Sequence, residues 1–90
     1  MTAKFVYMTA ADRDEARRIA ETLVAERLIA CANILGEIES VYRWEGQVAR
    51  GREVAVILKT RESLVDRVLS RAAELHSYDC PCVVVLGIEH

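Results

Sequence analysis

The order in which strand-like and helix-like patterns follow one another constrains this chain of 90 residues more than any other feature. Four segments have apolar residues that alternate with period two or run without interruption, as is typical of strands. These segments are Lys4–Ala10, Cys31–Trp44, Glu53–Thr60 and Cys82–Ile88. Apolar residues recur at helical spacing between the first and second segments, and again between the third and fourth. The predicted order is therefore strand, helix, strand, strand, helix, strand.

The ends of the two helices can be predicted from local signals. Asp12 and Glu15 form a D-x-x-E capping box, so we expect the first helix to begin at Asp12 and to run to about Leu28. Thr60 is the predicted N-cap of the second helix, whose apolar stripe extends from Leu64 to Leu75.

The two middle strands are expected to form a long hairpin. Glu45-Gly46-Gln47 supplies the turn, and Gly36 in the middle of the first arm predicts a bulge. Because a strand rises about 3.3 Å per residue, the outer arms should project beyond the helices.

This order predicts the fold class α+β, as a single domain over residues 1–90. It is the ferredoxin-like βαββαβ arrangement, with an antiparallel four-stranded sheet. Right-handed crossovers place both helices on one face of that sheet.

The second face of the sheet is expected to be too apolar for a monomer. An open antiparallel face normally reads polar at alternate positions, yet 54–58 and 83–88 are apolar on both faces. Soluble monomers rarely expose such a patch, so we predict that the chain assembles with copies of itself. The alternative is that a C-terminal segment not present in this sequence covers the face.

Composition narrows the classes of partner and location. The formal net charge is −2, with acidic and basic residues interspersed, so we expect no nucleic acid and no membrane as partners. The three cysteines are an odd number, which disfavours a disulfide scaffold. The N-terminal residues lack the pattern of a signal peptide, which favours the cytoplasm.

Several stretches, taken in order, resemble the CutA family. They are TAADRDEARRIAETLVAERLIACANI, VYRWEGQV, VILKT and LHSYDCP, and together they cover nearly the whole chain. The resemblance implies a ferredoxin-like fold and a homotrimer held by strand pairing between subunits. It also implies a role in divalent-cation tolerance and, in some members, copper binding.

The chain departs from the family pattern at a few positions. Ala11 and Ser77 stand where proline is usual, and Cys82 stands where a glutamate is usual. Family members usually continue beyond His90 into a tail with a short helix.

Four residues are candidate metal ligands. His76 matches the family's histidine, and Met8 occupies the position of a cysteine implicated in copper binding in some members. Cys80 and Cys82 form a C-x-C whose thiols share one face of an extended chain and, with His76, could make a soft three-ligand site. The structural alternatives are that His76 offsets a helix C-terminus, that Met8 fills the core, and that both cysteines are small apolar residues entering a strand.

Other polar and aromatic residues are open to two interpretations. The hairpin tip could line a cleft between subunits with Tyr42, Arg43, Trp44 and Glu45. The alternative is that Trp44 is a packing anchor for the next subunit. Lys59, Tyr78 and Asp79 are candidates for polar contacts near the end of the second helix, either in a ligand pocket or as structural hydrogen bonds.

The leading hypothesis is a trimeric protein, not an enzyme, that acts in tolerance of divalent metal ions, copper above all. It would work by binding the metal or by signalling like the PII regulators. We find neither a catalytic triad signature nor a glycine-rich phosphate loop, and we expect no organic cofactor. The alternative is a small-molecule or protein-interaction module in which metal binding is incidental.

Overall fold

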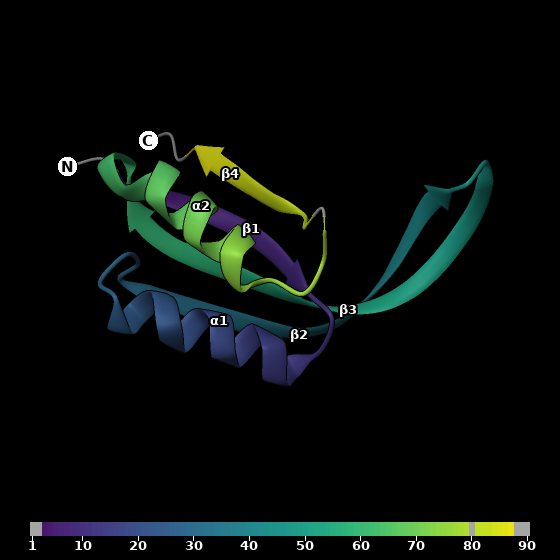
Figure 1. Cartoon of the computed structure of the whole chain (residues 1–90), viewed down its shortest axis with the longest axis horizontal. Coiled ribbons are helices and arrows are strands. Elements are labelled where there is room, and N and C mark those ends of the chain that lie inside the picture. Colours follow the sequence, from purple (N-terminus) through teal and green to yellow (C-terminus); the bar gives the residue numbers. More distant parts are fainter. Residues whose placement is uncertain (1–2, 80, 88–90) are drawn as a thin grey trace.

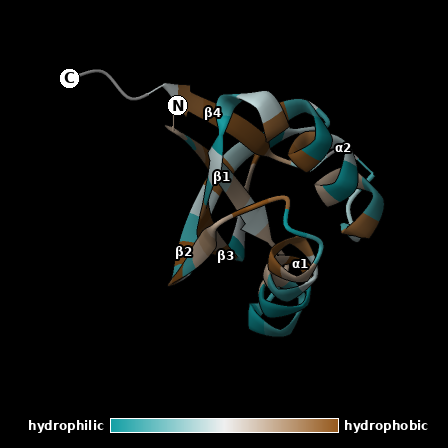
Figure 2. Cartoon of the chain, turned by 90° about the vertical axis from the view of Figure 1, so that its left-hand side faces the viewer, coloured by the Kyte–Doolittle hydropathy of each residue, from teal (hydrophilic) through white to brown (hydrophobic). Residues whose placement is uncertain are grey.

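The computed structural model describes residues 3–79 and 81–87, so the predicted ligand Cys80 lies outside the described part. The elements in chain order are β1 (Ala3–Ala10), α1 (Arg13–Ala25), β2 (Cys31–Trp44), β3 (Gln47–Arg61), the 3-10 helix η1 (Glu62–Leu64), α2 (Val65–Leu75) and β4 (Val83–Gly87). All strand pairs are antiparallel, in the order β2-β3-β1-β4. Both helices lie on the same side of the sheet (Figure 2). The predicted α+β, ferredoxin-like βαββαβ fold is confirmed.

The core lies between this covered face of the sheet and the two helices. Strand β1 is central, and Val6, Met8 and Ala10 on its covered face are fully buried. The same core includes buried apolar residues from β3 and both helices: Val54, Val56, Leu58, Ile19, Leu23, Val68 and Ala72. Burying each large side chain contributes about 1.5–3 kcal/mol, so this layer is the main source of stability.

Helix α1 begins as predicted and ends earlier than predicted. Asp12 is the N-cap, and its carboxylate accepts a hydrogen bond from the Glu15 N–H at 2.8 Å. At the other end Arg27 takes a φ of +60°, its N–H donates to the Val24 carbonyl, and the Leu28 N–H donates to the Leu23 carbonyl. These are the two bonds of a Schellman motif. The expectation of a helix to about Leu28 was therefore wrong, because the chain reverses at Arg27 and Leu28 packs beneath the helix end.

Strands β2 and β3 form a hairpin whose outer part projects as an arm from the body of the molecule (Figure 1). The two-residue turn consists of Glu45 and Gly46, with φ values of +50° and +79°, as a type I′ turn requires. The bulge predicted at Gly36 is confirmed by a register shift between Ile34 and Gly36, where the glycine has a φ of +115°.

Thr60 does not cap the second helix. It is the penultimate residue of β3, and its hydroxyl donates to the Leu28 carbonyl at 2.7 Å in the buried interior. A turn of 3-10 helix separates it from α2, which has no side-chain N-cap. The hydroxyl is occupied by the loop after α1, a contact between distant segments that local sequence signals do not reveal.

The second face of the sheet has no helix over it. Phe5 and Tyr7 lie there on β1, and they pair with Leu86 and Val84 of β4, which are 44% and 47% exposed. The ammonium group of Lys59 lies 5.5 Å from the centre of the Phe5 ring on this face. No helix in the described part of the chain is both long and apolar enough to cross a bilayer.

Candidate functional site

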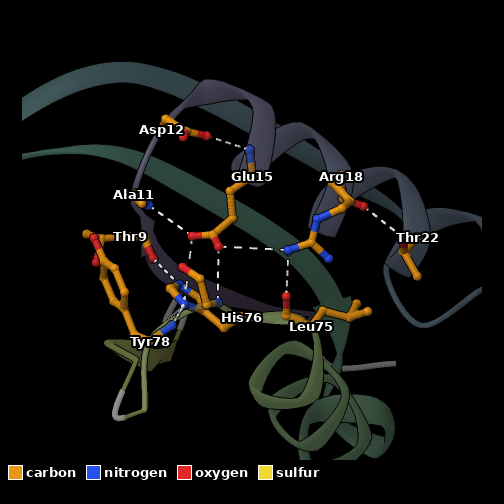
Figure 3. Close-up of polar contacts among 10 residues, drawn as sticks. Thr9, Ala11, Asp12, Glu15, Arg18, Thr22, Leu75, His76 and Tyr78 are labelled. Atoms are coloured by element: carbon orange, nitrogen blue, oxygen red, sulfur yellow. Dashed lines mark hydrogen bonds and ion pairs between the residues drawn. The ribbon is translucent and has the colours of Figure 1, made fainter.

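A network of polar side chains lies where the end of β1, the start of α1 and the loop after α2 meet (Figure 3). Glu15 is its centre. The capping box places this residue in the first turn of α1, where one carboxylate oxygen accepts the Ala11 N–H and the other accepts the Ser77 N–H, both at 3.0 Å. Glu15 therefore ties the start of α1 to a loop 62 residues further along the chain.

The carboxylate of Glu15 is only 8% exposed. Burial by itself raises its pKa, but the hydrogen bonds from Ala11 and Ser77 outweigh burial and hold the pKa below its ordinary value. Arg18 adds a weaker contact at 3.8 Å and donates a hydrogen bond to the Leu75 carbonyl at the end of α2. Glu15 is therefore an ionised, fully hydrogen-bonded group at neutral pH.

His76 follows α2 directly, and its side chain is fully buried. Its Nε2 lies 2.7 Å from the Thr9 carbonyl oxygen, and its Nδ1 accepts the Tyr78 N–H at 3.1 Å. An N–H can donate to Nδ1 only when that nitrogen carries no proton, so these partners assign the neutral tautomer with the proton on Nε2. Both ring nitrogens of His76 are therefore engaged within the protein.

A second carboxylate, Glu53, lies on the open face beside this network. Its two oxygens accept hydrogen bonds from the Thr9 hydroxyl at 3.3 Å and from the Ser40 hydroxyl at 2.6 Å. Burial raises the pKa of Tyr78, and the neighbouring charge of Glu53 raises it further. Glu53 thus connects β1, the base of the β2–β3 arm and the loop that carries Tyr78.

This arrangement holds three parts of the fold in register and leaves few groups free for chemistry. Every buried side-chain nitrogen and oxygen in the described residues has a hydrogen-bond partner. The described residues also contain no group of three His, Cys, Asp or Glu side chains placed to hold a metal ion.

The structure brings the three described candidates for metal ligands to one end of β1 but places their side chains differently. Thr9 accepts from His76 through its carbonyl, and its N–H donates to the Cys82 carbonyl at 3.3 Å, so both residues flank the end of β1. Met8, the preceding residue, is 0% exposed in the core, whereas Cys82 is an exposed free thiol. Of the three described candidates, only Cys82 is open to a metal ion from solvent.

Sequence reasoning identified parts of this network without its connections. The capping box pointed to Glu15 as a helix cap but carried no sign of its bond to Ser77. Tyr78 does take part in polar contacts, as one of the two interpretations held, whereas Lys59 lies over Phe5 instead. Glu53 was read only as the start of a strand, and no local signal marks its role.

The chain was compared with families, individual proteins and solved structures. The family model "CutA1 divalent ion tolerance protein" matches residues 4–90. The divalent-cation tolerance protein CutA of Pyrococcus horikoshii is 44% identical over 93% of this chain and 81% of its own length. The chloroplastic protein CutA 1 of Oryza sativa is 43% identical over 93% of this chain, which spans only 48% of that relative.

Solved structures agree with the sequence comparisons. The crystal structure of CutA1 from Oryza sativa superposes with a TM-score of 0.96 at 40% identity, covering 100% of this chain and 83% of that one. The divalent cation tolerance protein from Thermus thermophilus superposes with a TM-score of 0.93 at 36% identity, covering 98% of this chain and 85% of that one. Fold, family model and sequence identity together show that this chain belongs to the CutA1 family of divalent ion tolerance proteins.

Proposed function

We propose that the chain acts in divalent-cation tolerance as a non-enzymatic homotrimer in the cytoplasm, and that cysteine thiols, Cys82 above all, contact copper. The main observation in favour of assembly is that several large apolar side chains are exposed to solvent. On the arm, Val48 is 71% exposed and Trp44 is 64% exposed, and β4 adds Val84 and Leu86 on the open face.

Two further features support association of subunits. Strands β2 and β4 are the edges of the sheet, so each presents unpaired backbone groups that another chain can pair with. Removing apolar surface from water contributes about 25 cal/mol per Å², so covering a few hundred Å² stabilises the assembly by several kcal/mol per subunit. These surfaces argue for association, and the number three comes from the resemblance to the family.

The accessibility of the predicted ligands supports a specific form of copper contact. Thiolates are soft ligands that suit Cu(I), and the thiol of Cys82 is exposed. We assign the primary contact to Cys82, together with the neighbouring Cys80. His76 can join only if its bonds to Thr9 and Tyr78 break, and Met8 only if the core opens.

Sedimentation velocity at micromolar concentration tests the assembly. We expect a single species of about three times the chain mass of 10.1 kDa. Leu86→Lys, on the open face, should shift the protein to monomer, whereas Ser70→Lys, at an exposed position of α2, should leave the trimer intact. A folded, stable wild-type monomer at this concentration would overturn the proposal.

Titration with Cu(I) under reducing conditions tests the metal contact. We expect stoichiometric binding that Cys82→Ser weakens at least tenfold. Cys31→Ser is the matched control, because Cys31 is also an exposed free cysteine. Equal weakening by both substitutions would show binding to thiols in general and would contradict a site at Cys82.

A further inference from the structure

A pocket of about 560 Å³ opens at the opposite end of the sheet from the polar network. Ala3 lies at its margin, six residues and therefore about 20 Å along β1 from Thr9. The pocket is bounded by the end of α1, the loop that follows α1, the end of β3 and the 3-10 helix η1. Its volume falls within the range of about 300–1,000 Å³ that is typical of small-molecule sites.

The lining combines an apolar part with three cationic residues. Val24, Leu28 and Leu64 contribute apolar surface. Arg27, Lys59 and Arg61 also line the pocket, and the described residues contribute no acidic side chain to it. The ammonium group of Lys59 lies over Phe5 on the open face, so Arg27 and Arg61 carry the free positive charge of the pocket, with no carboxylate among the described lining residues.

The two arginines are available to a ligand. Both are exposed, and neither lies within ion-pair distance of a carboxylate in the described part of the chain. By contrast, the guanidinium group of Arg71 on α2 forms an ion pair with the carboxylate of Glu26 at 2.8 Å. The Schellman motif fixes the backbone of Arg27 at the pocket, and β3 fixes that of Arg61.

We propose that this pocket binds a small organic anion, a phosphate or carboxylate attached to an apolar body. The planar guanidinium groups of Arg27 and Arg61 suit the oxygens of such a group, which they can bind in bidentate fashion. The apolar lining suits the hydrocarbon part of the ligand. This site lies apart from the proposed copper contact, since Cys82 and the polar network lie at the other end of β1.

Backbone NMR of the full chain tests the proposal with phenyl phosphate as the probe. We expect saturable shifts of the amides of Ala30 and Arg61 at the pocket, with the Ser77 amide unchanged. Phenol lacks the charge and inorganic phosphate lacks the apolar body, so each should bind at least fivefold more weakly. Benzoate should also bind at the pocket, and its affinity relative to phenyl phosphate ranks carboxylate against phosphate, with either order supporting an anion site.

Two substitutions and a matched control locate the binding. Arg27→Gln and Arg61→Gln should each weaken phenyl phosphate at least fivefold. Arg67→Gln removes the same charge from an exposed position of α2 outside the pocket lining and should change the affinity less than twofold. Equal binding of phenol, shifts centred away from the pocket, or equal weakening by Arg67→Gln would overturn the proposal.

Discussion

The buried carboxylate of Glu15 offers a sharp test of how the polar network contributes to stability. Glu15→Gln keeps the size of the side chain but replaces one acceptor oxygen with an amide group that can only donate. The Ala11 and Ser77 N–H groups each donate to a different oxygen of Glu15, so one of them loses its acceptor. Leaving a buried donor without a partner costs about 1–3 kcal/mol, and we expect a loss of about 2 kcal/mol at pH 7.

Urea unfolding followed by circular dichroism at a fixed protein concentration measures this loss. The pKa of Glu15 is lowered in the folded state from an ordinary value of 4.5. Its contribution to stability is therefore fully present above about pH 4.5 and is lost as the pH falls through the lower, folded-state pKa. Glutamine does not titrate, so the difference in stability between wild type and variant should shrink in acid.

Glu21→Gln is the matched control, because Glu21 is an exposed carboxylate on the same helix. It should change the free energy of unfolding by less than about 0.5 kcal/mol. The reasoning would be refuted if Glu15→Gln cost no more than this control, or if its effect stayed constant from pH 7 to pH 3.

Three further substitutions test the backbone and the core, each by urea unfolding against wild type. Arg27→Gly should stabilise the protein by about 1 kcal/mol, because glycine adopts the φ of +60° without strain; a destabilised variant would contradict the Schellman assignment. Gly36→Ala should destabilise it by about 1–3 kcal/mol, since alanine rarely adopts a φ of +115°, and an unchanged stability would mean that the bulge relaxes freely. Leu58→Ala should cost about 2–5 kcal/mol by leaving a cavity in the core, whereas a smaller loss would show that the core collapses around it.

Much of the fold could be predicted because its signals are local. Period-two alternation marked β1, and the structure places Val6, Met8 and Ala10 together on its covered face. Asp12 marked the start of α1, and Gly36 marked the bulge, because a cap and a positive φ each require particular residue types. The resemblance of four motifs to the CutA family was confirmed by the family model over residues 4–90.

Other features depend on contacts between residues distant in the sequence. Arginine rarely adopts the left-handed backbone conformation that Arg27 has in the structure, so the residue type did not indicate the helix end. The predicted end was therefore too late. Thr60 looked like a helix cap, but in the fold its hydroxyl meets the Leu28 carbonyl, 32 residues away. The candidate site was predicted as a set of ligands, and folding engages both nitrogens of His76 with its own neighbours.

The sequence by itself determined the order of strands and helices, the turn, the bulge and the family, because each depends on the properties of a few consecutive residues. Only the tertiary structure decided that Glu15 reaches Ser77, that Thr9 joins His76 to Cys82, and that Arg27 and Arg61 line one pocket. The two residues of each of these pairs are 34 to 73 positions apart in the sequence. Only the packing of the helices on the sheet brings them close together.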